Sequence, residues 1–197
     1  MALAWPPPAD LELRSGAVTL RRYVSSDAPE LAEALQDSRI WEHLPVGLDG
    51  PRDWDAYAAK GAATGRWPFV VRLAKRHDEL SAAAAVGCSS FYDVSIDNSH
   101  LSIGYTTYRP EVWGTDVNPA TKRLLLGYAF DTLGAERVQF KTDNANLRSQ
   151  AALRKIGATQ EGVLRRHMLR RDGTYRDSVV FSILRSEWSA VRGRLGG

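Results

Sequence analysis

The chain has 197 residues, of which 44% are hydrophobic and 25% are charged, and its formal net charge is +3. This balance fits one globular domain with a proper core and excludes a disordered or fibrous protein. No apolar run approaches the roughly 20 residues of a membrane helix, and the single cysteine, Cys88, excludes an internal disulfide and a cysteine-based zinc site.

The first 15 residues are rich in proline and then in charge, which predicts a poorly ordered or surface-draped arm. They have neither the basic flank nor the long apolar core of a signal peptide. Cys88 lies in an apolar run and should be a small buried side chain, and its lack of a partner points to the reducing cytoplasm. We therefore expect a flexible arm at 1–15, one domain at 16–188 and a C-terminal tail at 189–197.

Periodic patterns predict the elements in the first half of the chain. Residues 17–24 alternate as in a strand. Asp27, with Glu30 three residues later, is typical of a capping box at the start of a helix. The other elements expected in this half are short helices at 40–44 and 53–63 and strands at 67–73 and 83–92.

The most informative stretch is a strand, a loop and a helix. Residues 101–108 alternate with a period of two, and apolar residues at helical spacing predict a helix over 119–133. Asn118 before Pro119 is typical of an N-cap followed by the first helical residue, and Gly134 ends the helix. A helix start after such a loop can bind a phosphate, although a connection without any ligand fits the same pattern.

The strand that follows should complete a crossover. Residues 137–142 alternate cleanly, and the helix before them should place this strand parallel to the strand at 101–108. A second helix is expected at 147–156. The pair Asp172-Gly173 predicts a tight turn between the last two strands, of which the final one, at 178–184, should be buried.

Three motifs in this order resemble the RimJ/RimL branch of the GNAT-superfamily N-acetyltransferases, which acetylates protein α-amino groups. They are the loop and helix at 113–126, the segment 143–158 with its Asn-x-x-Ser sequence, and the closing strands at 161–165 and 176–184. The resemblance implies an α/β (α+β) fold with a twisted, mostly antiparallel sheet of six to seven strands, flanked by helices. A central parallel pair would splay to hold acetyl-CoA. The resemblance also supports a strand at 83–92, where the run of alanines by itself would favour a helix.

The resemblance further implies the residues that contact acetyl-CoA. The family loop reads Gln/Arg-x-x-Gly-x-Gly/Ala, and this chain keeps only Gly114, with Asp116 and Asn118 at the later small positions. We expect the phosphates to bind loop amides from about 114 to 117, and the Asp116 carboxylate to point outward, toward Arg123 or Lys122. No metal is expected. The implied cofactor-binding residues are Tyr108, Trp113, Gly114, Thr115, Asp116, Val117, Asn118, Lys122, Asn144, Asn146 and Ser149.

Acetyl transfer from a thioester to an amine needs a neutral amine, a donor to the thioester oxygen and a proton source for the leaving thiolate. The resemblance implies that backbone N–H groups near Tyr105 and Tyr108 supply the donor. Ser149 would be the proton source, and Asn146 would bind the pantetheine arm. Asn146 and Ser149 would serve equally well at a helix cap. The catalytic candidates are therefore Tyr105 and Ser149.

A general base is not assigned by the sequence. An α-amine with a pKa of about 7.7–8.0 needs no dedicated base. The candidates are Glu161, His167, His43 and Asp143. For the acceptor pocket the resemblance indicates Trp41, Trp54, Trp67 and Tyr92, and the tryptophans fit ordinary core positions equally well.

Three functions remain open at this level. The leading one is an acetyl-CoA-dependent N-acetyltransferase acting on a protein N-terminus or on a small amine such as a polyamine or an aminoglycoside. An acidic groove would favour polyamines or aminoglycosides, and a neutral groove with backbone-binding groups would favour a peptide. A second function is CoA binding or sensing without catalysis.

The third function is an RNA-associated module built on the basic run at 165–176. Such residues on a hairpin usually form a solvated rim, and no stacking platform accompanies them, so we expect no nucleic-acid partner. The expected partners are CoA and the acceptor amine, with no membrane, and a homodimer is compatible with the sequence.

Overall fold

The structure, a computed structural model of the chain, describes residues 2–44, 53–170 and 172–196. In this part of the chain, eight strands form one sheet in the order β1-β2-β3-β4-β5-β6-β8-β7. All neighbours are antiparallel except β5 and β6, which are parallel. The strands are β1 (Glu12–Arg14), β2 (Val18–Arg22), β3 (Trp67–Leu73), β4 (Ala85–Ser95), β5 (His100–Tyr108), β6 (Arg137–Asp143), β7 (Thr159–Leu169) and β8 (Tyr175–Leu184).

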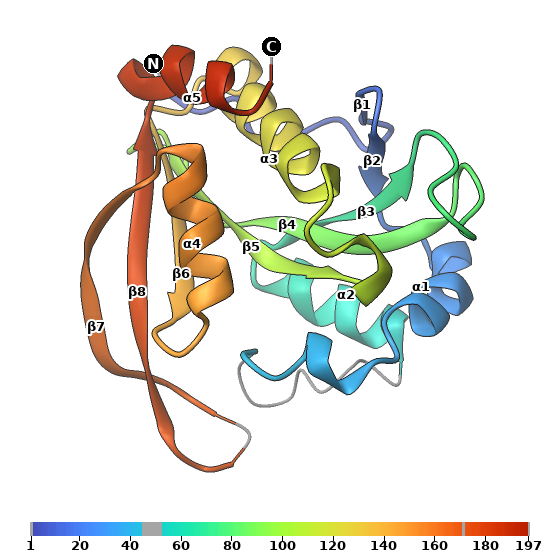
Figure 1. The fold of residues 1–197 in the computed structure, drawn as a ribbon. Coiled ribbons are helices and arrows are strands. Elements are labelled where there is room, and N and C mark those ends of the chain that lie inside the picture. The colour runs from blue at the N-terminus through green and yellow to red at the C-terminus, as the bar shows by residue number, and fades with distance from the viewer. Residues whose placement is uncertain (1, 45–52, 171, 197) are drawn as a thin grey trace.

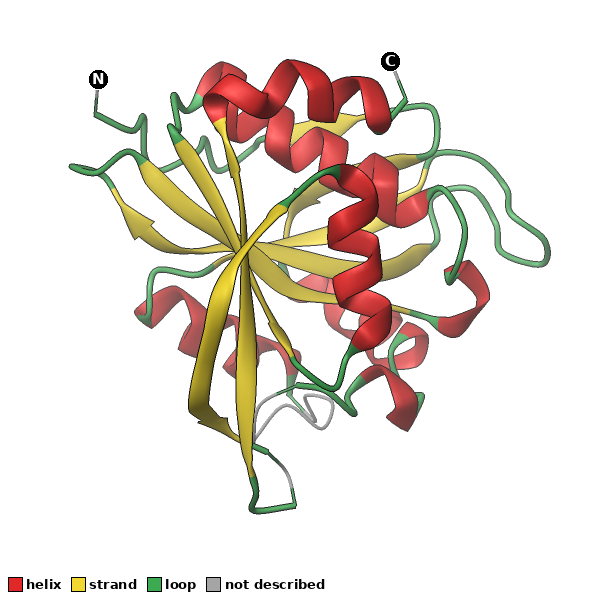
Figure 2. Cartoon of the chain, turned by 60° about the vertical axis from the view of Figure 1, so that its left-hand side comes forward, coloured by secondary structure: helices red, strands yellow, loops and turns green. Residues whose placement is uncertain are grey.

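Helices cover both faces of this sheet (Figures 1 and 2). They are α1 (Ala28–Ala34), α2 (Trp54–Ala63), α3 (Val117–Gly127), α4 (Leu147–Ile156) and α5 (Trp188–Arg194). Side chains of β3 alternate between two hydrophobic clusters, because successive residues of a strand point to opposite faces. Phe69 and Val71 pack in the larger cluster with α3, α4 and α5, and Val70 packs with α1 and α2. The mixed sheet, its parallel crossover and its flanking helices are confirmed.

The sheet has eight strands rather than six to seven, because the N-terminal segment contributes β1. The side chain of Ser15 forms the turn, since its Oγ accepts the N–H groups of Ala17 and Val18 at 3.3 and 3.0 Å. Ahead of β1, Leu3 is only 4% exposed and joins the main core. The described part of the expected N-terminal arm therefore packs on the domain, which fits a surface-draped arm.

The start of α3 also differs from the expectation. The helix begins at Val117 with Asp116 as its N-cap, so Asn118 is the second helical residue and not the cap. Pro119 is tolerated there because the first N–H groups of a helix have no partner within it. After Gly127 the helix continues as a π-helical turn, Tyr128–Thr132.

The expected capping box at α1 is wrong. Asp27 makes no side-chain bond to the helix. Its carboxylate, 1% exposed, accepts the Val24 N–H at 3.0 Å and pairs with Arg21 and Arg72. Glu30 instead accepts the N–H of Ala85 at 2.6 Å. Both carboxylates therefore tie α1 to the sheet rather than capping the helix.

Candidate active site

The parallel pair separates soon after it begins. β5 and β6 pair only at three positions, residues 100–102 with 137–139, and then diverge (Figure 1). On the other side of β5, Thr107 pairs with Cys88 and Gly104 pairs with Ser90, so β5 has one more residue than β4 between these pairs. Tyr105 lies in this bulge with a φ of 50°, which is uncommon for a residue other than glycine. A bulge leaves backbone groups outside the ladder, here beside the gap between the two strands.

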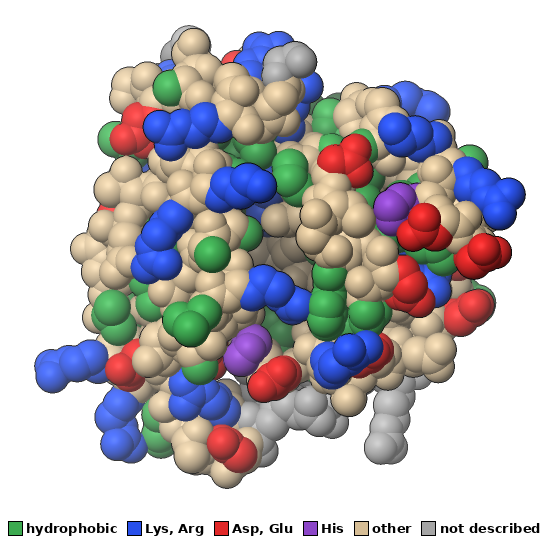
Figure 3. All heavy atoms as spheres, in the orientation of Figure 1, with side chains coloured by type: hydrophobic (Ala, Val, Ile, Leu, Met, Phe, Trp, Pro, Cys, Tyr) green, Lys and Arg blue, Asp and Glu red, His purple; other side chains and the backbone are tan. Residues whose placement is uncertain are grey.

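A cavity of about 400 Å³ fills this gap. Its walls are residues 103–108 of β5 and 140–143 of β6, the start of α3, one side of α4, and the 3-10 helix Ser38–Ile40 (η2) with the residues after it. The space-filling view shows the molecule hollowed at the centre of this face (Figure 3). The cavity is therefore a consequence of the divergence of the parallel pair.

The lining of the cavity is basic. Among the lining residues that the structure describes, Asp143 is the only carboxylate, and it is bound by Arg170 at 2.8 Å. Two of the cations are also paired: Lys141 with Asp93 at 2.7 Å, and Arg39 with Asp37. The basic lining residues are Arg39, Lys122, Lys141, Arg148, Lys155 and Arg176. Such a lining favours anionic ligands.

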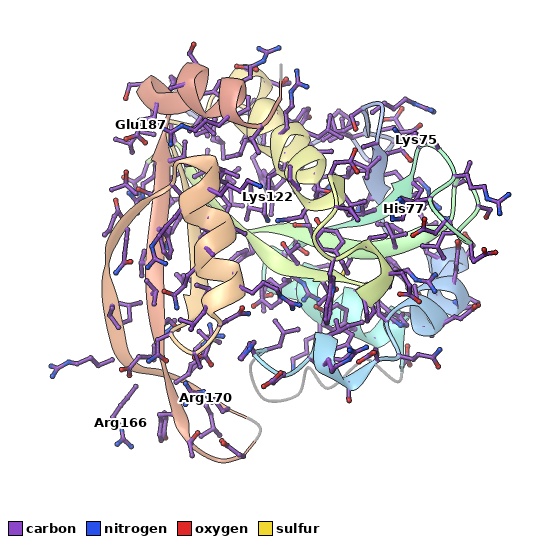
Figure 4. The ribbon with its side chains drawn as sticks, viewed as in Figure 1. Lys75, His77, Lys122, Arg166, Arg170 and Glu187 are labelled. Carbon is purple, nitrogen blue, oxygen red and sulfur yellow. The ribbon has the colours of Figure 1, made fainter. Side chains whose placement is uncertain are left out.

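Lys122, in α3, is buried and lines the cavity (Figure 4). Its side chain is 6% exposed, its Nζ donates to Thr106 Oγ1 at 3.1 Å, and it lies 5.5 Å from the centre of the Phe140 ring. Burial lowers the pKa of Lys122 from its ordinary 10.5 to about 7. A large fraction of Lys122 is therefore uncharged at neutral pH.

The loop residues predicted to bind the cofactor divide into two groups. Those that line the cavity are Tyr108, Trp113, Gly114, Thr115 and Asn118, whereas Asp116 and Val117 do not. Gly114 has a φ of 79°, a conformation that favours glycine. Trp113 is fixed by a bond from its Nε1 to the Tyr108 carbonyl at 2.8 Å and by Arg148, whose guanidinium lies 3.9 Å from the ring centre.

Asp116 is exposed and outside the cavity lining, as expected, but Lys122 bonds Thr106 instead of reaching it. We therefore expect Asp116→Gly to change the Kd for acetyl-CoA by less than about threefold, because an exposed charge is screened by solvent. Isothermal calorimetry measures this. Tighter binding by tenfold or more would show that the carboxylate faces the bound phosphates.

The start of α4 supplies the two candidates Asn146 and Ser149, and both line the cavity. Asn146 is the N-cap of α4, with its Oδ1 accepting the Ser149 N–H at 2.9 Å. The capping role is thus present, and the same bond fixes the first turn that carries the Ser149 side chain. Asn144 does not line the cavity and instead accepts a bond from Arg170 at 3.2 Å.

The four candidate bases occupy different environments. Arg137 and Ser182 bind Glu161, and the bond from Arg137 lowers the pKa of Glu161. Arg170 holds Asp143 in its ionised form. Neither is therefore a good proton acceptor.

The two histidines differ in their access to the cavity. His167 lies outside the lining, and its Nδ1 is 3.0 Å from Ser178 Oγ. Burial and the charges of Lys141 and Arg176 lower the pKa of His167. His43, by contrast, lines the cavity. Of the four candidates, the geometry favours His43.

The aromatic residues expected in the acceptor pocket lie mostly in the core. Trp41 is 2% exposed and packs against Trp54. Trp67 packs against Trp5. Neither lines the cavity, so the core interpretation is the one that the structure supports. Tyr92 is also outside the lining but makes an edge contact with Tyr105, with ring centres 5.0 Å apart.

Sequence reasoning missed Thr106 and most of the basic residues that line the cavity. Arg148 lies within the Asn-x-x-Ser helix, and its position one residue before Ser149 was a usable signal. Arg176 was counted in the basic rim of the hairpin, yet it is buried. No group of three or more His, Cys, Asp or Glu in residues 2–44, 53–170 and 172–196 is placed to hold a metal ion. Nor is any helix of these residues long and apolar enough to cross a membrane.

Known proteins share these features. The family model for the acetyltransferase (GNAT) domain matches residues 17–159. The Bacillus subtilis (strain 168) protein YdaF, provisionally named a ribosomal N-acetyltransferase, is 27% identical over 177 residues, which are 89% of this chain and 95% of YdaF. A crystal structure from T. thermophilus, provisionally described as an acetyltransferase, matches with a TM-score of 0.81 at 32% identity and covers 97% of each chain.

A fourth comparison concerns the fold. Mycobacterium smegmatis RimJ, solved in complex with CoA-disulfide, is 21% identical and has a TM-score of 0.77, covering 99% of this chain and 96% of RimJ. Its structure shows the same architecture. The diverging parallel pair, the bulge beside it and the matching family model agree, and the chain is an acyltransferase that belongs to the GNAT acetyltransferase family.

Proposed function

We propose that this acyltransferase uses acetyl-CoA and transfers the acetyl group directly to a primary amine, either a protein N-terminus or a small molecule, in the cytoplasm. The observation that carries the proposal is the gap between β5 and β6, lined by basic residues and bordered by the bulge at Tyr105. The gap offers a thioester both an extended slot and free backbone N–H groups. The basic lining of the gap also suits a polyanionic cofactor such as acetyl-CoA.

The walls of the cavity suggest where each part of acetyl-CoA would bind. The phosphates would lie at the loop around Gly114 and the start of α3, where N–H groups without helical partners favour anions. The pantetheine arm would follow the gap past Asn146 and Lys122. The thioester would then lie beside Tyr105 and near Ser149, where the N–H groups of the bulge can stabilise its oxygen.

In the reaction, the nitrogen of the acceptor attacks the thioester carbon, so that a C–N bond forms and the C–S bond breaks. The bulge at Tyr105 would stabilise the negative charge on the oxygen. Ser149 would donate a proton to the leaving thiolate, and the proton lost by the amine would pass to His43 or to water. The products are an N-acetylated amine and CoA, and no residue changes its net protonation after exchange with solvent.

The deciding experiment uses isotope-labelled acetyl-CoA with a protein mixture and, separately, with small amines, followed by mass spectrometry. We expect the label on amines and a binding heat for acetyl-CoA at concentrations up to about millimolar. Binding without any labelled amine would support the alternative of a CoA-binding or sensing domain. If acetyl-CoA did not bind, both functions would be excluded.

Ser149→Ala should lower kcat and leave the Kd for CoA nearly unchanged, because a proton donor to the leaving thiolate acts mainly in the transition state. General acids contribute roughly 10²–10⁴-fold, so a loss of at least about tenfold in kcat is expected. Single-turnover kinetics on folded protein measures it. If the rate were unchanged and only the stability fell, Ser149 would have a structural role in the first turn of α4 and no catalytic role.

An RNA-binding function has less support. Of the basic run on the hairpin, Arg170 is bound to Asp143 and Arg176 is buried, so only part of it faces solvent. Arg166 does project from the hairpin (Figure 4). A surface with few unpaired cations and no aromatic residues for base stacking is a poor binding site for nucleic acid. The basic residues that remain inside the cavity fit the cofactor and the acceptor better.

A further inference from the structure

Arg176, near the start of β8, has an unusual environment for a buried arginine. It is 6% exposed, and its guanidinium donates to Ser178 Oγ at 3.1 Å, to the His43 carbonyl at 3.1 Å and to the Met168 sulfur at 3.3 Å. A buried charge is normally paired with an opposite one. Among residues 2–44, 53–170 and 172–196, no carboxylate forms an ion pair with it, and Asp143, whose charge acts on it most, is bound by Arg170.

Part of this guanidinium is available to a ligand. A guanidinium has five N–H donors, of which the three bonds above use three and leave two. Arg176 lines the cavity. Burial lowers the pKa of Arg176, yet an arginine stays protonated at neutral pH. The planar fork of a guanidinium matches a carboxylate, which can accept two N–H bonds at once.

The position of Arg176 distinguishes it from the phosphate site. Its bond to His43 joins β8 to the segment after η2, and both residues line the cavity. Arg176 and Tyr105 line the same cavity. Tyr105 is the bulge residue beside which the thioester would lie, whereas the phosphates would lie at the loop around Gly114. Arg176 therefore shares the cavity with the proposed thioester position, but it belongs to β8 and not to the loop proposed for the phosphates.

We propose that Arg176 binds a carboxylate of the acceptor, so that the preferred substrate is an amine that also carries a carboxylate. The proposal rests on the N-acetyltransferase function above and adds the class of acceptor. The carboxylate can belong to a free amino acid or to an acidic first residue of a peptide. Because Asp143 is the only carboxylate among the described lining residues and is already paired, a polycation such as a polyamine would be repelled.

The test compares matched acceptors that differ in the carboxylate. One pair is alanine and alaninamide, a second is a C-terminally amidated peptide beginning with Asp and its Asn counterpart, and spermidine is the polycation. Rates are compared as kcat/KM for the neutral form of each amine, because the carboxylate also changes the pKa of the amine. We expect the acidic member of at least one pair to be preferred at least tenfold, and the pair that shows this identifies the source of the carboxylate.

Arg176→Gln should raise KM for the acidic acceptor about tenfold or more and change its amide counterpart by less than threefold, because charge-assisted bonds are lost only for the acid. Arg176→Lys should recover part of the loss. The matched control is Lys141→Gln, which removes another cavity cation that Asp93 already neutralises. An unchanged Kd for CoA verifies that each variant is folded.

The outcomes separate the proposal from the function on which it rests. Equal use of acids, amides and spermidine by the unaltered protein, or an equal loss for acid and amide in Arg176→Gln, would overturn the carboxylate site and leave the transferase intact. If CoA binds but no acceptor in the panel is acetylated, calorimetry of the same pairs with the CoA complex decides: preferential binding of the acids supports the site, and no preference overturns it. If CoA does not bind, the proposed function itself fails.

Discussion

Lys122→Met should stabilise the folded protein, most strongly below about pH 7. Burial lowers the pKa of Lys122 from 10.5 to about 7, so between these pH values the unfolded chain holds a proton that the folded protein lacks. The stability of the unaltered protein therefore rises with pH across this window, and the full cost of burying the charge is present at pH 7 and below. At about 1.4 kcal/mol for each pH unit, that cost is on the order of 5 kcal/mol. Methionine has a similar length and carries no charge, so it removes the cost.

Urea unfolding of both proteins at pH 6 and at pH 10 measures this effect. We expect the advantage of Lys122→Met in the free energy of unfolding to be several kcal/mol larger at pH 6 than at pH 10. The control is Lys155→Met, because Lys155 also lines the cavity but is exposed, and its pH dependence should be small. An advantage of the same size at both pH values would show that Lys122 keeps its charge in the folded protein.

Asp143→Ala should lower the free energy of unfolding by about 3 kcal/mol, the usual cost of breaking a buried ion pair. The Asp143 side chain is 1% exposed and accepts bonds from Arg170 Nε and Nη2 at 2.9 and 2.8 Å and from the Ala145 N–H at 2.9 Å. Its removal leaves Arg170 without its main partner and frees the loop that leads to Asn146. We therefore expect turnover to fall as well, because that loop positions the first turn of α4.

Chemical denaturation at pH 7 tests this loss, with Asp93→Ala as the matched control. Asp93 pairs with Lys141 at 2.7 Å but is half exposed, so its removal should cost less than about 1 kcal/mol. Burial opposes the charge of Asp143, but the bonds from Arg170 and Ala145 outweigh it and lower the pKa of Asp143. Its contribution is therefore fully present above about pH 4 and is lost as the pH falls through the lowered pKa. Equal losses for both variants would mean that the Arg170 pair acts as an ordinary surface pair.

Residue patterns alone predicted most of the elements that build the site. Alternation placed β5 and β6, and helical spacing placed α3 and α4, because each pattern reflects which face of a local element is buried. The order of the three motifs then indicated the family, and the resemblance of the Asn-x-x-Ser segment to that family implied a role at the cofactor site for Asn146 and Ser149, which line the cavity. Those features depend on neighbours a few residues apart, which the sequence records directly.

Other features depended on contacts between distant segments. Leu3 and β1 join the core because they meet the rest of the sheet, not because their own sequence is periodic. Asn118 lies inside α3 because the helix starts two residues earlier than the Asn-Pro pair suggests. The bulge that sets Tyr105 in its left-handed conformation is a register difference between β4 and β5, and no local pattern encodes it.

The sequence by itself determined the family, the order of the elements and the strand, loop and helix that surround the cofactor slot. Only the tertiary structure decided which charges face that slot. Arg176 shares a face of β8 with Ser178 and is buried, whereas Arg166 lies within the register shift of β7 between Leu164 and Met168 and stays exposed. Lys122, likewise, looks in the sequence like any other cation on a helix. Only the packing of α3 beside the cavity buries it, and this burial lowers the pKa of Lys122. The sequence gives the type of each ionisable side chain, but the fold determines how much water surrounds that side chain and therefore its pKa.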